Sequence, residues 1–214
     1  MSGSFDFEGG RLSIGIDALD RQIDGGIPAG SIVAYCAPPA SQSELLLYEL
    51  TNTRHTLYLS TDRTEDAVAD AFSRADCPTG DPDIRYVSNE APLENAWRMF
   101  RELGGGENLI IDPADALERT ERGRYQNFLN ELHNHVQNTG SLAILHCMRG
   151  TDPGLRTVTE HMADVVFDLR QHVEGSEIET RLSVPKFRGG HALAETIKLE
   201  LIDRVRVDTS RDIA

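Results

Sequence analysis

The segment from Ser31 to Leu50 constrains the fold of this chain more than any other part of it. It reads SIVAYCAPPASQSELLLYEL, which is an apolar run, a loop of small residues and a second apolar run. The first run is predicted to be a buried strand and the second a helix. A buried strand that turns directly into a helix is typical of α/β folds.

The rest of the chain continues this alternation of apolar strands and helices. Residues 11–30 suit a short strand and then a helix that ends at Gly25-Gly26. Further strands are predicted over 55–60, 84–88, 108–112 and 142–147, and helices over 65–74, 92–103 and 122–137. Such an alternation predicts a mostly parallel central sheet with helices on both faces.

The final third of the chain has a different pattern. From Ala163 the segments DVVFDLR, EIETRLSVPKF, TIKLELI and RVRVDT alternate apolar and polar residues, with little helical sequence between them. This pattern predicts an antiparallel C-terminal extension of the sheet with one face in water. We expect residues 11–214 to form a single domain. Residues 1–10 should be a flexible lead, in which Phe5 and Phe7 are alternatively able to dock on a partner.

The charged residues limit the classes of partner. The net charge is −14, and only two of the 21 basic residues are lysines. A protein that tracks phosphates needs clustered basic residues, so direct nucleic-acid binding is not expected. An excess of Asp and Glu with few lysines favours a halophilic, archaeal source, since high salt screens the self-repulsion. An ordinary acidic cytosolic protein is the alternative.

The three cysteines are too few and too irregularly spaced for a disulfide framework or a zinc site. Cys36 and Cys147 each end an apolar strand and are predicted to be small buried hydrophobic residues. Neither a secretory signal nor an apolar run of membrane-spanning length is seen. We therefore expect a cytoplasmic protein without a metal site or a membrane span.

The loop after the first core strand has the position of a phosphate-binding loop but not its chemistry. A working loop reads G-x-x-x-x-G-K-[ST], in which the lysine contacts phosphates and the hydroxyl contacts Mg²⁺. The eight equivalent residues here are Ala37, Pro38, Pro39, Ala40, Ser41, Gln42, Ser43 and Glu44. Loss of the lysine, together with a carboxylate beside a polyphosphate, should weaken ATP binding by several orders of magnitude.

The same loop contains a capping-box pattern. Ser41-Gln42-Ser43-Glu44 fits S-x-x-E before an apolar run. We predict that Ser41 accepts a hydrogen bond from the Glu44 N–H and that the Glu44 carboxylate accepts one from the Ser41 N–H. In the alternative, Glu44 points to solvent from an ordinary first turn. A capping box would place a built-in anion where a phosphate would bind.

The chain resembles the RecA-like ATPases of the KaiC and archaeal RadA group. RLSIGIDALDRQIDGGIPAGSIVAYCAPPASQSE is similar to the segment that leads into their phosphate loop. LYLSTDRTED, NLIIDPADAL and LAILHC are similar to the strand before their catalytic acidic pair, their Walker B strand and their sensor strand. VPKFRGGHAL is similar to their K-x-R-G-x-H segment. The resemblance covers nearly the whole chain and implies a RecA-like three-layer fold.

The resemblance also implies roles for six residues. Asp62 lies where the family has its first catalytic acidic residue, Asp112 lies at the Walker B position, and His146 lies at the sensor position. Arg63 replaces the second acidic residue, so all three positions are expected to be vestigial. Asp112 is expected to cap its strand or form an ion pair, and His146 to be hydrogen-bonded at a polar strand end. Lys186, Arg188 and His191 match the segment that reaches a neighbouring subunit's nucleotide; a basic structural turn is the alternative.

Taken together, these substitutions favour a non-catalytic, regulatory or scaffolding member of this group. Such a protein has no cofactor, and acts through protein partners that include an active RecA/KaiC-type ATPase or a second copy of itself. The first alternative is a divergent ATPase that binds ATP and Mg²⁺ through an unusual loop. The second is a recombination mediator of the RadA-paralogue type, which contacts DNA through an active recombinase.

Overall fold

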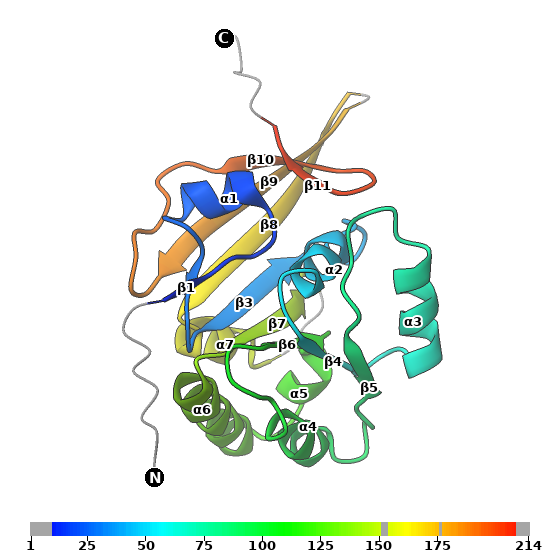
Figure 1. Cartoon of the computed structure of the whole chain (residues 1–214), viewed down its shortest axis with the longest axis vertical. Coiled ribbons are helices and arrows are strands. Elements are labelled where there is room, and N and C mark those ends of the chain that lie inside the picture. The colour runs from blue at the N-terminus through cyan, green and yellow to red at the C-terminus, as the bar shows by residue number, and fades with distance from the viewer. Residues whose placement is uncertain (1–9, 151–153, 176, 209–214) are drawn as a thin grey trace.

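The computed structural model describes residues 10–150, 154–175 and 177–208 (Figure 1). The predicted lead and its Phe5 and Phe7 therefore lie outside the described residues, apart from Gly10. Within these residues the main sheet has nine strands, and β1 (Arg11–Leu12) and β2 (Ile27–Pro28) form a separate antiparallel pair. The main sheet runs β11 (Val205–Val207), β10 (Ile197–Leu201), β9 (Glu177–Phe187), β8 (Val165–Glu174), β3 (Ile32–Ala37), β7 (Leu142–Met148), β6 (Asn108–Asp112), β4 (Thr56–Ser60), β5 (Asp83–Tyr86).

The pairing within the sheet confirms the predicted α/β class. Strands β8, β3, β7, β6, β4 and β5 are parallel to one another, whereas β9, β10 and β11 continue the sheet beyond β8 through antiparallel pairs. One detail of the prediction is wrong, because β8 pairs in parallel with β3 and joins the parallel part of the sheet. Only the first half of β8, Val165–Asp168, pairs with β3. The second half extends beyond β3, and this half gives the strand its alternating pattern.

Helices cover both faces of the sheet, as predicted (Figure 1). One layer contains α1 (Asp17–Gln22), α2 (Glu44–Thr51) and α3 (Glu65–Ser73), whose apolar side chains share a core cluster. The other contains α4 (Pro92–Phe100), α5 (Asp115–Glu118), α6 (Arg122–Thr139) and α7 (Arg156–Met162). The short helices α5 and α7 were not predicted, because DALE and RTVTEHM carry no clear apolar periodicity.

The central strands are buried along their whole length. All residues of β3, β4 and β6 are buried, because helices cover both faces of these strands. The described thiols, Cys36, Cys77 and Cys147, are free and buried, which confirms the prediction for Cys36 and Cys147. Helix α6 ends at Thr139, two residues beyond the predicted 122–137, and is followed by Gly140, whose φ of +64° is the left-handed conformation that glycine adopts at helix ends.

The strand order brings distant segments together at one edge. Ala37 pairs with Met148 at the ends of β3 and β7, and Ser60 pairs with Asp112 at the ends of β4 and β6. The loop to α2 therefore lies beside the carboxyl ends of β6 and β7. In open α/β sheets ligands bind at this edge. None of the helices in the described residues has the length and apolar character that a bilayer crossing requires.

Candidate functional site

The loop from β3 to α2 adopts a compact turn that differs from the predicted capping box. Helix α2 begins at Glu44, so Ser43 is its N-cap residue and no side chain caps the helix. Ser41 instead donates its hydroxyl hydrogen to the Pro38 carbonyl, and the two oxygen atoms lie 2.5 Å apart. The prediction was wrong because it made Ser41 the N-cap residue, two residues before the observed N-cap Ser43. With the start at Glu44, the two side chains are no longer in the N-cap and N3 positions.

One feature of a phosphate loop persists in the backbone. Gln42 has a φ of +52°, a left-handed conformation at the position where the motif has its second glycine. The Gln42 side-chain amide faces the β10–β11 turn, and with its nitrogen turned to that side it donates to the carbonyls of Leu201, at 2.8 Å, and Ile202, at 3.2 Å. The Glu49 carboxylate on α2 accepts a hydrogen bond from Val205 N, at 2.6 Å. The loop and its helix are thus both tied to the antiparallel hairpin.

Behind the loop, three side chains form a buried hydrogen-bonded series. Ser43 Oγ lies 3.0 Å from His146 Nε2, and His146 Nδ1 lies 2.6 Å from Asp112 Oδ1. The exposed fractions of these residues are 3 %, 1 % and 3 %. Ser43 follows β3, Asp112 ends β6 and His146 lies on β7, so the strand order alone brings them together. The prediction that His146 is hydrogen-bonded at a polar strand end is confirmed.

Asp112 is also bound through its second carboxylate oxygen. Tyr58 donates its hydroxyl hydrogen to Oδ2, and the Arg63 guanidinium forms an ion pair with Oδ2 at 3.0 Å. Burial raises the pKa of Asp112, but the hydrogen bond and charge of His146, the hydrogen bond from Tyr58 and the charge of Arg63 outweigh it and lower the pKa to about 2. The predicted ion-pair role of Asp112 is confirmed. Asp112 is therefore an ionised carboxylate at neutral pH.

The other residues implied by the resemblance lie outside this series. Asp62 is exposed, and its pKa is raised by partial burial and then by the charges of Asp112 and Asp115.

Tyr58 belongs to the site through its hydrogen bond to Asp112, and the sequence did not predict this role. Its position in the alternating core strand HTLYLS gave no indication that its hydroxyl meets a carboxylate.

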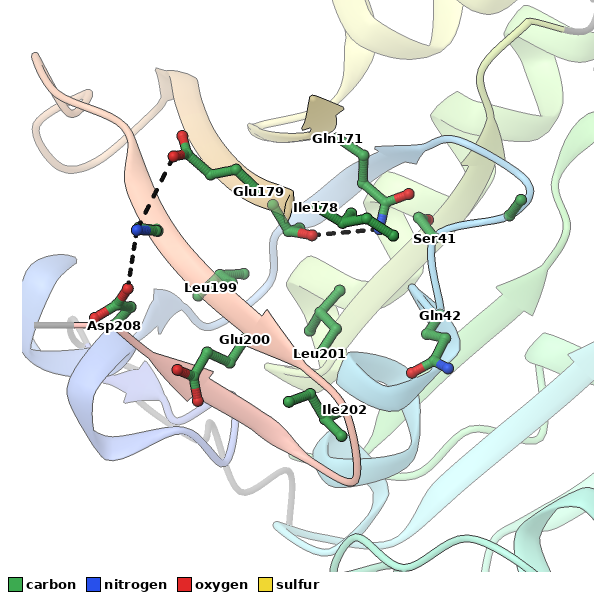
Figure 2. A pocket seen from close by; sticks show the side chains of 13 residues that line it. Ser41, Gln42, Gln171, Ile178, Glu179, Leu199, Glu200, Leu201, Ile202 and Asp208 are labelled. Carbon is green, nitrogen blue, oxygen red and sulfur yellow. Dashed lines mark hydrogen bonds and ion pairs between the residues drawn. The ribbon is translucent and has the colours of Figure 1, made fainter. Parts of the chain in front are cut away.

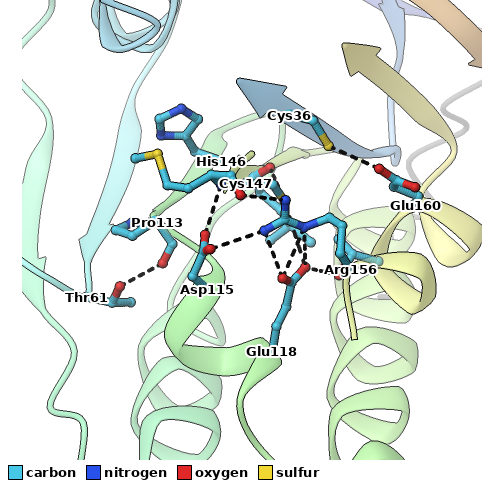
Figure 3. A network of polar contacts seen from close by, with 12 residues as sticks. Cys36, Thr61, Pro113, Asp115, Glu118, His146, Cys147, Arg156 and Glu160 are labelled. Carbon is cyan, nitrogen blue, oxygen red and sulfur yellow. Dashed lines mark hydrogen bonds and ion pairs between the residues drawn. The ribbon is translucent and has the colours of Figure 1, made fainter. Parts of the chain in front are cut away.

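A second buried polar network, also missed, lies next to the first (Figure 3). Arg156 on α7 forms ion pairs with Glu118, at 2.9 Å, and Asp115, at 3.3 Å, both on α5. Asp115 also accepts a hydrogen bond from Met148 N, at 3.0 Å. Burial raises the pKa of Glu118, although the bonds from Arg156 and Thr159 oppose this. The network fastens α5 and α7 to the end of β7. The two acidic residues in PADALE, Asp115 and Glu118, are the sequence feature from which this network could have been predicted.

The basic segment near the end of β9 lies at the opposite edge of the sheet. Lys186 Nζ donates to the carbonyls of Glu160, at 2.9 Å, and His161, at 2.6 Å, which end helix α7. Arg188 donates to Asp164 and to the same His161 carbonyl. His191 is exposed and lies 3.7 Å from Asp24. Cations at a helix C-terminus stabilise its free carbonyls. The trans-acting role of these three residues stays a prediction.

The residues at the loop do not fit a magnesium–polyphosphate group. Ser43 supplies no charge and is already hydrogen-bonded to His146, while Glu44 adds a carboxylate at the helix start. Asp112 Oδ2 is already paired with the Arg63 guanidinium. Among the residues that the structure describes, no cluster of three or more His, Cys, Asp and Glu side chains has the arrangement of a metal site.

A groove of about 530 Å³ opens on the other side of the loop (Figure 2). Ser41 and Gln42 form one wall, Gln171 and Ile178 come from β8 and β9, and Leu199 and Leu201 come from β10. Three of the exposed large apolar side chains, Val173, Ile178 and Ile202, lie on the hairpins around it. Gln42, which lines this groove, directly precedes Ser43 of the buried series.

The comparisons with known proteins identify the family without identifying an activity. No curated protein matches the chain. The model of a family of unknown function, DUF7125, matches residues 11–214. That match covers the loop, the buried series, the basic segment and the groove. The chain therefore belongs to the DUF7125 family.

Proposed function

We propose that this protein is a RecA/KaiC-like regulatory or scaffolding protein that does not hydrolyse ATP and acts through protein partners in the cytoplasm. The observation that carries the proposal is the buried series of Ser43, His146 and Asp112 with Arg63. Each member occupies a position that the resemblance assigns to nucleotide or metal chemistry. Each is bonded to another member instead.

The charges of this series support the proposal. An active site of this kind presents a lysine to the phosphates and carboxylates to the metal. Here Arg63 supplies positive charge, and its ion pair with Asp112 offsets that charge within the protein. A bound polyphosphate would meet Glu44 without a compensating lysine. Losing one charge-assisted hydrogen bond costs about 1.5–3 kcal/mol, before the repulsion is added.

Calorimetry with Mg-ATP tests the first half of the proposal. We expect no heat of binding at micromolar or low millimolar ATP. Replacing Ala37, Ala40 and Gln42 with Gly, Ser43 with Lys and Glu44 with Thr should restore binding. Micromolar affinity in the wild-type chain would refute the proposal, and failure of the rebuilt, folded loop to bind would show that the loop is not the cause.

A divergent ATP-binding protein is the second candidate, and one observation favours it. The left-handed backbone at Gln42 is retained where the motif has glycine, so the loop keeps part of the shape that aims N–H groups at an anion. The wild-type titration decides between the two candidates. A Gln42→Ala variant is a suitable companion, since it removes the side-chain link to the hairpin while leaving the rest of the loop sequence unchanged.

The partner half of the proposal needs a separate test. An active RecA/KaiC-type ATPase from the same cell is mixed with the protein, and its ATPase rate is measured. We expect the rate to change, and a Lys186→Ala, Arg188→Ala variant to lose the effect. The same variant should show a lower melting temperature, because both cations bind the end of α7. An unchanged rate with wild-type protein would contradict regulation of that ATPase.

A further inference from the structure

The buried series has the geometry of a nucleophile, a base and an orienting acid. We propose that Ser43, His146 and Asp112 form a relay that accepts the acyl group of a small activated ester on Ser43. The 3.0 Å and 2.6 Å contacts are within the range for such a relay. Ser43 also lies at a strand-to-helix turn, and the chain order Ser, Asp, His is one of the orders in which this geometry occurs. The inference is independent of the proposed function, since acyl transfer needs no nucleotide.

The hydrogen bonds define the direction of proton transfer. An ionised carboxylate only accepts hydrogen bonds, so His146 Nδ1 carries a proton and donates its N–H to Asp112 Oδ1. In the neutral imidazole the other nitrogen, Nε2, then presents its lone pair to Ser43 Oγ. Tyr58 and Arg63 hold the second oxygen of Asp112 and so fix the carboxylate plane. His146 is therefore oriented as a general base toward the serine hydroxyl.

The start of α2 supplies backbone donors for the developing negative charge. The first bonds of this turn run from Leu45 N to Gln42 O, at 3.1 Å, and from Leu46 N to Ser43 O, at 3.3 Å. The N–H groups of Ser43 and Glu44 precede them and belong to the positive end of the eight-residue helix. An N–H on the residue after the nucleophile is a common oxyanion donor. Glu44 N is in that position.

The groove next to the loop gives the acyl group a place to bind. Leu199, Leu201 and Ile178 supply apolar surface, and Gln42, the residue before Ser43, lines the groove (Figure 2). With its nitrogen turned to the β10–β11 turn, the Gln42 amide ties the loop to the carbonyls of that turn, and Ser43 is buried. Access to the hydroxyl therefore requires Gln42 to move. The fitting substrate class is an ester with a short apolar acyl chain.

The chemical step balances without a metal or a redox partner. As Ser43 Oγ bonds to the ester carbonyl carbon, its proton passes to His146 Nε2. The bond from that carbon to the leaving alkoxy oxygen then breaks, and the oxygen takes the proton from Nε2. Water attacks the acyl-serine by the same route, giving a carboxylic acid and the free serine. Asp112 stays ionised throughout.

A fluorophosphonate probe tests the nucleophile directly, with 4-nitrophenyl acetate as the ester. We expect one probe per chain, on Ser43, with no labelling of Ser43→Ala. The buried Ser31→Ala variant serves as the matched control, since Ser31 is 5 % exposed at the other end of β3, and it should label normally. His146→Gln, checked for folding by circular dichroism, should slow labelling about 100-fold.

A second variant keeps the proposal open to refutation if His146→Gln does not fold. Gln42→Ala releases the loop from the hairpin, so it should label faster than wild type and show a larger burst of 4-nitrophenol. No labelling of Ser43 in either wild type or Gln42→Ala, while a known serine hydrolase labels in the same tube, would overturn the relay. Labelling that is unaffected by a folded His146→Gln variant would overturn it as well. Neither result changes the expectation for Mg-ATP binding.

Discussion

At the residue scale, Asp112 holds the candidate site together because three donors meet on its buried carboxylate. His146, Tyr58 and Arg63 all bind it, and it is 3 % exposed. A buried charge is stable only while its partners remain. The sequence indicated that Asp112 and His146 lie at strand ends. It did not indicate that one carboxylate serves three donors, since Tyr58 is spaced like any core residue.

Acid should remove part of the stability that Asp112 provides. An unfolded aspartate has a pKa of about 3.9, and the folded pKa of Asp112 is about 2. Because the folded pKa is the lower one, the contribution is complete above about pH 4 and is lost as the pH falls toward about 2. We expect the difference in unfolding free energy between wild type and Asp112→Asn to shrink by about 2 kcal/mol over that range. Urea titrations at several pH values measure it, and a constant difference would contradict the shift.

Removing the His146 imidazole should lower the free energy of unfolding, because both of its neighbours in the buried series lose a hydrogen-bond partner. His146→Ala leaves the Asp112 carboxylate and the Ser43 hydroxyl without their shared partner in a buried place. We expect a loss of about 3–5 kcal/mol in unfolding free energy. His172→Ala, at an exposed histidine on β8, should change it by less than about 0.5 kcal/mol. Equal effects of the two substitutions in urea unfolding would argue against the network.

At the element scale, side-chain hydrogen bonds fix the second half of α2 to the rest of the protein, whereas its first turn has no side-chain cap. Glu49 is buried and binds the backbone of β11 through Val205 N, whereas the helix start has no side-chain cap. The S-x-x-E pattern predicted the reverse. Local sequence could not locate the first helical residue, because the turn at Gln42 and the bond from Ser41 to Pro38 delay the start of the helix by two residues.

Two glutamates of α2 provide a matched pair for testing this arrangement. Glu49→Ala should cost about 1–3 kcal/mol, since it leaves the Val205 N–H without its acceptor. Glu44→Ala should change the unfolding free energy by less than about 0.5 kcal/mol. Hydrogen exchange followed by mass spectrometry should show faster exchange in β11 for Glu49→Ala alone. A larger effect of Glu44→Ala would restore the capping-box prediction.

At the scale of the whole molecule, the acidic surface predicts a dependence on salt. The net charge is −14, and self-repulsion of this size falls as ions screen it. We expect the melting temperature to rise by several degrees from low to molar KCl. A variant with exposed Asp66, Asp76 and Asp81 changed to Asn should rise less. A melting temperature that falls with KCl would contradict a halophilic origin.

The amino-acid sequence by itself determines the layered α/β fold. Buried parallel strands must be apolar throughout and the covering helices must be amphipathic, so both patterns are legible along the chain. Only the tertiary structure decides which polar side chains meet. His146 is 34 residues from Asp112 and 103 from Ser43, and their contact depends on the order of β3, β7 and β6 in the sheet. Strand order is set by packing over the whole core, and no local pattern encodes it.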